Sequence, residues 1–348
     1  MAAVDYVELA LEEAPLNELT YDDATPGYRI STDLVYPPSR TAKIAPGPLP
    51  MSRADELRGI AGEVPRLADS YEPSGVLTTR AYGDLLPLLL SLCGFSGVHT
   101  AGNGVITDPD ADTIPTAAHR WVFTKDAGIT AQTARVRTNY ADENVLLEGY
   151  GFACSQLGLT AAAELSTDLV GLFMRRLAAD AATVPTVQDS DIQPFRRGDL
   201  FVSALAGGGP LSDFTVSIAN TLERIHSSSL DPPSDWPDLL EFGDDQVAVS
   251  GTIPKRILTG TDLDALIAAT TFAMTARWTG RSSIGATVKK YGLWIEMPKC
   301  QYISGDHDEL ANRRRHGFSP DWFATWDEAL GYDAKITVVC GIAAIATY

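Results

Sequence analysis

Short runs rich in Val, Ile, Thr, Tyr and Phe follow one another from about Glu63 onward, with turn-forming residues between them. These residue types favour strands. Several runs alternate between apolar and polar residues, as residues 215–219 do, which indicates strands with one buried and one solvated face. The sequence therefore predicts a mainly β fold, with strands expected at residues 75–80, 120–124, 133–140, 145–159, 169–177, 214–221, 246–253, 272–278, 291–303 and 334–344.

Two segments have the signals of short α-helices. Residues 84–93 begin with Asp84 at the expected N-cap and are followed by Gly94, while Pro87 falls in the first turn, where its missing N–H is tolerated. Residues 262–269 place apolar side chains at helical spacing. We expect one short helix in each half of the chain.

The surroundings of the two helices predict an internal duplication. Ser74-Gly75 precedes Asp84, and Ser250-Gly251 precedes Asp262; the offsets are 250 − 74 = 176 and 262 − 84 = 178, close to half of 348 residues. The alternative is coincidence, since both dipeptide patterns are common. The duplication predicts tandem β-sandwich or β-barrel domains at residues 63–206 and 207–348, each with a short flanking helix.

Other segments are poor in periodic pattern. Residues 1–62 have a Pro-rich middle and are expected to form an extended N-terminal arm that is either loose or laid on another surface. Within it, the alternation at residues 7–11 predicts one edge strand. Residues 227–238 and 304–326 are expected to be long loops.

The charge balance limits the partners of the chain. There are 27 Lys and Arg residues and 45 Asp and Glu residues, so the net charge is 27 − 45 = −18. Gripping the phosphate backbone requires basic side chains, so this balance argues against tight nucleic-acid binding. It does not argue against a surface along which DNA passes without sticking.

The cysteines and the N-terminus bear on the compartment. Cys93, Cys154, Cys300 and Cys340 are far apart in sequence, which favours free thiols over a disulfide framework. The chain is therefore expected to be made in a reducing compartment or to be indifferent to redox conditions. Residues 1–25 contain acids and no Lys or Arg, the reverse of a signal peptide. The longest apolar stretches are shorter than the roughly 20 residues of a membrane span, so we expect a soluble chain without membrane contact.

The candidate metal-binding motifs lack ligands at the required positions. Asp108, Asp110 and Asp112 resemble the start of a calcium loop, but Thr113 and His119 stand where glycine and glutamate are required. The run Asp306-His307-Asp308-Glu309 has no second ligand group at metal-site spacing and favours a solvated loop. We therefore expect no catalytic, cofactor-binding or metal-binding residues and no enzymatic activity.

Three further features favour structural roles. His119 and His226 lie at expected strand margins, where a polar residue is common. The basic run 313–315 favours an inter-subunit ion pair over a DNA contact in a chain of this charge. Four tryptophans near the C-terminus favour core or interface packing; they are Trp278, Trp294, Trp322 and Trp326.

Several segments resemble, in order, a known family. Residues 72–77 (Glu-Pro-Ser-Gly-Val-Leu) lead into residues 82–90 (Tyr-Gly-Asp-Leu-Leu-Pro-Leu-Leu-Leu), and residues 119–124, 144–160, 169–173, 214–220 and 247–253 follow. Together they resemble the major tail tube proteins of tailed, siphovirus-like phages. Order and spacing carry this resemblance, which covers about residues 63–303.

The resemblance implies a structural virion protein. Its β-sandwich domains would join those of neighbouring subunits into rings, and stacked rings would form the tail tube through which the genome is ejected. A chain with two domain copies would need three subunits for a pseudo-hexameric ring; a homohexamer is the alternative. The implied partners are other copies of the chain and the tape-measure, terminator and distal tail proteins.

The resemblance also implies a role for the excess of Asp and Glu residues. A lumen lined with Asp and Glu would repel the backbone of double-stranded DNA passing through it, without specific binding. The implied location is the virion tail, assembled in the host cytoplasm. The alternatives are another ring-forming virion component, such as a tail terminator or an injection-type tube, and a soluble β-sandwich binding module or hydrolase.

Overall fold

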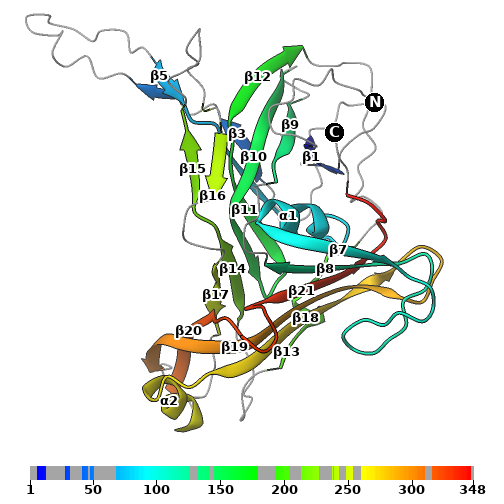
Figure 1. Cartoon of the computed structure of the whole chain (residues 1–348), viewed down its shortest axis with the longest axis vertical. Coiled ribbons are helices and arrows are strands. Elements are labelled where there is room, and N and C mark those ends of the chain that lie inside the picture. Colours follow the sequence, from blue (N-terminus) through cyan, green and yellow to red (C-terminus); the bar gives the residue numbers. More distant parts are fainter. Residues whose placement is uncertain are drawn as a thin grey trace, which may run out of the picture.

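The computed structural model describes residues 6–12, 28–31, 41–45, 48–50, 68–125, 132–140, 145–178, 193–203, 213–226, 237, 239–242, 248–253, 260–309 and 316–345. Within these ranges the chain is mainly β with two short α-helices, and every strand pairing is antiparallel (Figure 1). The mainly β expectation is confirmed.

The helices are α1 (Leu86–Leu92) and α2 (Gly260–Ile267), with a 3₁₀ turn, η1, at Arg197–Asp199. The strands of the first half are β1 (Tyr6–Leu11), β2 (Tyr28–Ser31), β3 (Thr41–Ala45), β4 (Pro48–Pro50), β5 (Ala68–Tyr71), β6 (Ser74–Arg80), β7 (Phe95–Ala101), β8 (His119–Lys125), β9 (Ala134–Tyr140), β10 (Val145–Thr160), β11 (Glu164–Val170), β12 (Phe173–Ala178) and β13 (Leu200–Ser203). Those of the second half are β14 (Thr215–Ala219), β15 (Leu222–Ile225), β16 (Leu239–Phe242), β17 (Ala248–Thr252), β18 (Phe272–Ser283), β19 (Lys290–Glu309), β20 (His316–Ala324) and β21 (Lys335–Cys340).

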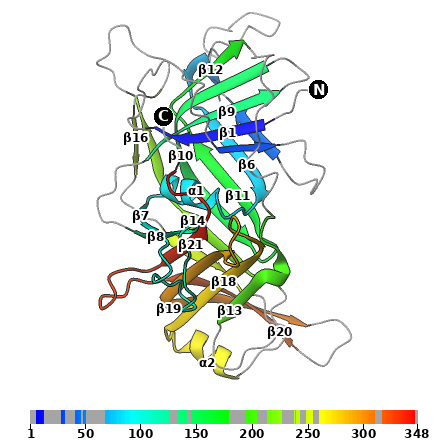
Figure 2. The same cartoon turned by 90° about the vertical axis from the view of Figure 1, so that its right-hand side faces the viewer.

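The strand β10 connects two regions of one branched sheet. Its first half lies between β9 and β12, and the upper region has the order β2-β1-β9-β10-β12 (Figure 2). Its second half lies between β11 and β14, and the lower region runs β3-β6-β11-β10-β14-β17-β20-β19. Two short hairpins, β4–β5 and β15–β16, pair separately.

A glycine marks the point where β10 changes partners. The pairing of β10 with β9 shifts register between Gly149 and Phe152, and Gly151 has φ +67°. Residues other than glycine rarely adopt this left-handed backbone conformation. A Cβ added at Gly151 would also lie 2.7 Å from the Leu172 side chain. Glycine is therefore needed at this corner for both conformation and space.

The strand β19 divides the lower region into branches. On one edge it pairs with β18, which in turn pairs with β13. On the other edge it pairs first with β21 and then, further along, with β20. The strand β21 continues through β8 to β7. As a result, strands of both halves of the sequence surround α1 (Figure 1).

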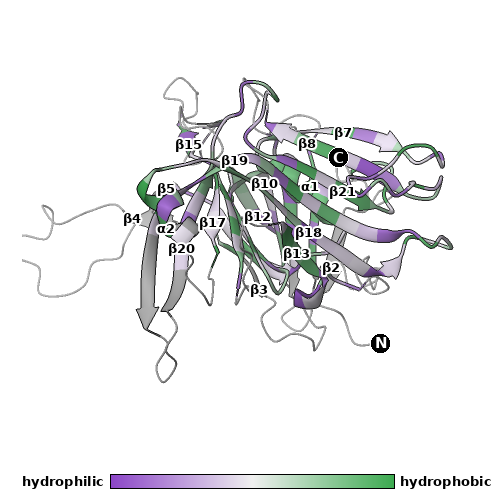
Figure 3. Cartoon of the chain, turned by 90° about the horizontal axis from the view of Figure 1, so that it is seen from below, coloured by the Kyte–Doolittle hydropathy of each residue, from purple (hydrophilic) through white to green (hydrophobic). Residues whose placement is uncertain are grey.

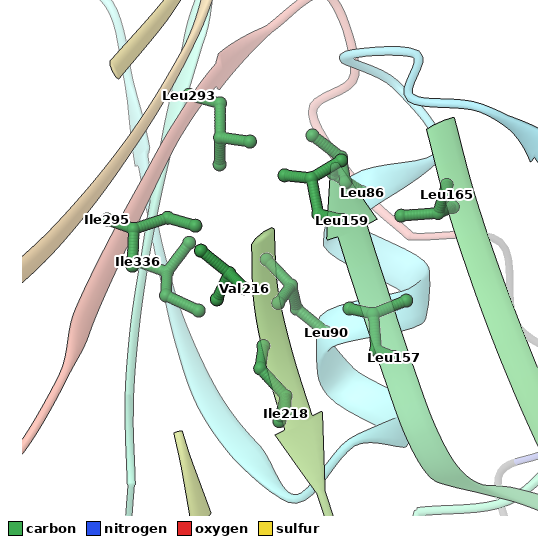
Figure 4. A pocket seen from close by; sticks show the side chains of 10 residues that line it. All are labelled: Leu86, Leu90, Leu157, Leu159, Leu165, Val216, Ile218, Leu293, Ile295 and Ile336. Carbon is green, nitrogen blue, oxygen red and sulfur yellow. The ribbon is translucent and has the colours of Figure 1, made fainter. Parts of the chain in front are cut away.

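Helix α1 lies inside the fold, and all seven of its residues are buried. The hydrophobic core is continuous around it and joins residues of both sequence halves. In Figure 3 the segments around α1 carry hydrophobic colours, whereas several loops and strand ends are hydrophilic. Leu86 and Leu90 of α1 face Leu157, Ile218 and Ile336 across a cavity of about 20 Å³ (Figure 4). Its apolar walls offer a ligand no hydrogen bond, which is typical of a small packing defect.

The sheet crosses the domain boundary expected at residue 206. Strands from before this residue pair with strands from after it in β10–β14, β13–β18 and β8–β21. The order strand, helix, hairpin occurs twice, as β6-α1-β7-β8 and as β17-α2-β18-β19. The division into two copies stays a prediction, and the two ranges share one sheet and one core.

Three local expectations are corrected. The segment expected as an edge strand at residues 7–11 is β1, an interior strand between β2 and β9. Residues 304–326 are largely a ribbon of β19 and β20, because backbone pairing extends to Glu309 despite the polar sequence. Asp84 is not the N-cap of α1: Leu85 takes that position, with no side-chain cap.

Other expectations concern parts that are only partly described. The described pieces of residues 1–62 include β1 and β3, which add to the sheet, with Val7, Leu9 and Ile44 buried. Of residues 227–238 only Pro237 is described, and residues 313–315 lie outside the described ranges.

Candidate functional site

A ladder of alternating charges crosses the upper region of the sheet. Glu8 of β1 lies opposite Arg137 of β9, Arg137 lies opposite Glu148 of β10, and Glu148 lies opposite Arg175 of β12. Directly opposed residues share one face of a sheet. These four residues, called the charge ladder below, therefore form one row of alternating sign. The strands that carry them, β1, β9, β10 and β12, can be followed in Figure 2.

Glu148 lies between Arg137 and Arg175 in this row and has no exposed surface. Arg137 Nε donates to Glu148 Oε1 at 2.8 Å, and Arg175 Nε donates to Oε2 at 3.0 Å. Arg135 Nη1 lies 3.7 Å from Oε1, and the Tyr150 hydroxyl donates to Oε2. The carboxylate is thus compensated on both oxygens, as a buried charge must be.

The contacts change the acidity of this group. Burial alone raises the pKa of the Glu148 carboxyl, but the Tyr150 hydrogen bond, the charge of Arg137 and the hydrogen bonds from Arg137 and Arg175 outweigh it and lower that pKa below its ordinary value. Burial, followed by the hydrogen bond to Glu148, raises the pKa of Tyr150 to about 12. Glu148 is therefore ionised and Tyr150 neutral at physiological pH.

A second carboxyl lies at the same corner of β10. Glu12 accepts hydrogen bonds from Thr133 Oγ1 at 2.7 Å and from the Gly151 N–H at 3.1 Å. Burial raises the pKa of Glu12, although Thr133, Gly151 and Arg135 partly offset it. Two carboxyls with opposite pKa shifts are a pattern of acid–base sites. Glu148, however, is fully enclosed by its protein donors, so the arrangement fits a structural clamp on the corner.

The three aspartates after β7 are engaged by basic side chains. Asp108 Oδ1 accepts from the N–H groups of Asp110 and Asp112 at 3.0 and 2.9 Å, and its other oxygen pairs with Lys289. Asp110 pairs with Arg277 at 2.7 Å. These contacts fasten the β7–β8 loop to the β18–β19 hairpin. No cluster of three or more metal-ligating side chains occurs among the described residues.

His119 and His226, the two histidines considered in the sequence analysis, are not in contact with each other. His119 begins β8, and its Nδ1 lies 3.2 Å from His99 Nε2 of β7. Burial, and secondly the charge of His99, lower the pKa of His119. His226 follows β15 and is exposed. The backbone of Asp306-His307-Asp308-Glu309 belongs to β19 instead of a loop, and the side chains of this run are outside the described part.

The tryptophan and cysteine side chains largely follow expectation. Trp278, Trp294 and Trp322 are buried, whereas Trp326 is 51% exposed. All four cysteines are buried and free.

Two edge strands lack the residues that usually block strand addition. In the described part of the chain, β7 pairs only with β8, and β13 only with β18. Neither strand contains Lys, Arg, Asp, Glu or Pro. Val98 of β7 is 62% exposed and Phe201 of β13 is 54% exposed. Within the described ranges, each of these uncharged strands has one unpaired edge, the feature that allows another strand to add to a sheet.

Sequence reasoning missed both the charge ladder and the β7 edge. The alternation Arg135-Val136-Arg137 beside Glu148 was a signal for the ladder, because charged residues recurred at strand period. Residues 94–112 are rich in Gly and Asp, a composition typical of loops, and this concealed β7 within them.

Comparison with known proteins adds no assignment: no protein-family model and no curated protein matches this chain. Within the described ranges, neither helix has the length and apolar character needed to cross a membrane.

Proposed function

We propose that this chain is a structural virion protein that assembles with copies of itself into stacked rings, forming a tail tube through which DNA is ejected. The ordered resemblance of residues 63–303 to tail tube proteins supports the proposal. The mainly β fold and the net charge of −18 agree with it.

The observation that carries the proposal is the pair of uncharged edges on one continuous sheet. A protein that works as a monomer normally blocks such edges with charges, proline or a covering segment. Strands β7 and β13 leave Val98 and Phe201 exposed instead. Closing the sheets of neighbouring subunits into a ring would pair these edges and remove them.

The proposed ring contains three subunits in pseudo-hexameric order, with a homohexamer as the alternative. Tape-measure, terminator and distal tail proteins would meet the ends of the stack. The DNA would pass without specific contacts, because an acidic wall repels its phosphates within about 8 Å at physiological salt.

Electron microscopy of the purified, concentrated chain tests this proposal. We expect rings and stacks of rings, and Val98→Lys should prevent them, because lysine on an edge strand disfavours strand addition. Val105→Lys is the matched control: Val105 is 78% exposed, but it lies in the β7–β8 loop, so this variant should assemble normally.

The outcomes separate the possible assemblies. A monomer at every concentration contradicts the proposal, and single rings that never stack favour a terminator-like component. The mass of one ring decides between three and six subunits. Each variant is also tested by thermal unfolding, so that a loss of assembly is not confused with a loss of fold.

A further inference from the structure

Two cysteines from distant parts of the sequence lie close together at the C-terminal end of α1. Cys93 is the C-cap residue of α1, and Cys154 lies in β10. One amide nitrogen, Asn220 Nδ2, donates to the Cys93 carbonyl oxygen and to the Cys154 carbonyl oxygen, each at 2.9 Å. The two backbone segments are therefore fixed side by side, since both oxygens lie within hydrogen-bonding distance of the same atom.

The side chains continue this approach. The Cys154 side chain lies close enough to the Cys93 thiol to act, together with burial, on its pKa, and both residues have no exposed surface. A disulfide requires Cα atoms about 4.4–6.8 Å apart and side chains directed toward each other. Carbonyl oxygens that share one donor and thiols that influence each other are consistent with such a pair before oxidation.

We propose that Cys93 and Cys154 are a modification site: an oxidant converts them into a disulfide that joins the end of α1 to β10. This inference does not depend on the proposed function. It concerns the stability of the folded chain under oxidising conditions.

The reaction balances with a disulfide oxidant such as oxidised glutathione. One cysteine loses its proton, attacks the oxidant as a thiolate and forms a mixed disulfide, releasing one glutathione thiolate. The second cysteine then attacks the protein sulfur of the mixed disulfide and releases the other glutathione. Two protein thiols are oxidised, one glutathione disulfide is reduced to two thiols, and the two protons move to glutathione.

Burial controls the rate of this reaction. Burial, with the neighbouring Cys154, raises the pKa of the Cys93 thiol, so little reactive thiolate exists at neutral pH. The folded chain should therefore oxidise slowly, through local opening of α1. Once formed, the bond closes a loop across residues 94–153 and restricts the unfolded chain.

The experiment treats the full chain with oxidised glutathione in two ways: in the folded state, and during refolding from denaturant. Remaining thiols are alkylated, and peptides from a non-reducing digest are identified by mass spectrometry. We expect a Cys93–Cys154 cross-linked peptide, two alkylated thiols instead of four, and an unfolding temperature several degrees above that of the reduced chain.

Variants in which one cysteine is replaced test which two cysteines form the cross-link. Cys93→Ala and Cys154→Ala should each abolish the cross-link and the temperature shift. Cys300→Ala is the matched control, since Cys300 is buried in β19 and burial alone accounts for the raised pKa of its thiol. It should preserve both effects.

Two results would overturn the proposal. One is the absence of a Cys93–Cys154 peptide even after oxidative refolding to the native fold; the other is a cross-link that uses Cys300 or Cys340 instead. A cross-link formed on refolding, with slow formation in the folded state, supports it, because the buried thiols are then limited by access and not by geometry.

Discussion

Glu148 of β10 and Arg137 of β9 are directly opposed across the sheet, and Arg137 Nε donates to Glu148 Oε1 at 2.8 Å. Both side chains are almost completely buried. Glu148 lies three residues before Gly151, where β10 leaves one set of partners for another. The charge ladder therefore fixes the register of four strands at the point where the two sheet regions join.

Removing the central carboxylate should destabilise the chain strongly. Glu148→Ala removes the buried acceptor to which Arg137, Tyr150 and Arg175 all donate, and breaking a buried pair in this way costs about 3–5 kcal/mol. Urea unfolding at neutral pH measures the change in free energy of unfolding. Glu164→Gln is the control: Glu164 pairs with Arg80 at 3.4 Å but its side chain is 44% exposed, and such pairs contribute about 0–1 kcal/mol. Equal effects of the two variants would contradict a clamping role for Glu148.

The contact between His99 and His119 predicts a loss of stability in mild acid. Burial, and secondly the charge of His99, lower the pKa of His119 from its ordinary value of 6.5, so the unfolded chain takes up a proton at a higher pH than the folded chain. The stabilising contribution is complete above pH 6.5 and is lost as the pH falls from there through the folded-state pKa.

Replacing the titrating group tests this dependence. His119→Gln should make stability change less between about pH 7 and about pH 5, the range in which histidine titrates. The measurement is the urea midpoint at several pH values. His226→Gln, at an exposed position after β15, should keep the wild-type dependence. A wild-type profile for His119→Gln would refute the assignment.

Each strand run expected from the sequence contains part of an observed strand, but several observed strands, among them β7 and β20, lie outside the expected runs. The run 169–177 contains parts of two strands, because Gly171 and Leu172 separate β11 from β12. Apolar alternation shows which face of a strand is buried, but the number of its paired edges depends on distant segments. For this reason β1 was expected at an edge and is interior.

The partners within the charge ladder, and those of Asp84, come from distant segments of the sequence. Asp84 stands where a helix cap is expected, yet its carboxylate accepts from the Gly341 N–H at 2.8 Å, across 257 residues of sequence. The Tyr291 hydroxyl donates to the other oxygen at 3.4 Å. Sequence reasoning identified the polar residue, and only the fold supplies its partners.

These partners give a prediction for Asp84 itself. Burial raises the pKa of the Asp84 carboxyl, although the bonds from Gly341 and Tyr291 partly offset it, so its charge opposes folding at neutral pH. Asp84→Asn keeps an acceptor for Gly341 and removes the charge, and its stability should equal or exceed that of the wild type. Asp84→Ala leaves the Gly341 N–H without its acceptor and should cost about 1–3 kcal/mol. Thermal unfolding at neutral pH compares the two, and an Asn variant as unstable as the Ala variant would show that the charge itself is needed.

Two glycines allow the cost of a left-handed backbone conformation to be separated from the cost of a steric clash. Gly151 and Gly104 both have positive φ, +67° and +75°. An added Cβ at Gly104 meets nothing within 4 Å, whereas at Gly151 it lies 2.7 Å from Leu172. Gly104→Ala should therefore cost only the backbone strain of about 1–2 kcal/mol. Gly151→Ala adds the clash with Leu172, which typically costs a further 1–3 kcal/mol. Urea unfolding of the two variants measures the difference, and combining Gly151→Ala with Leu172→Ala should recover part of the additional loss if the clash is its cause.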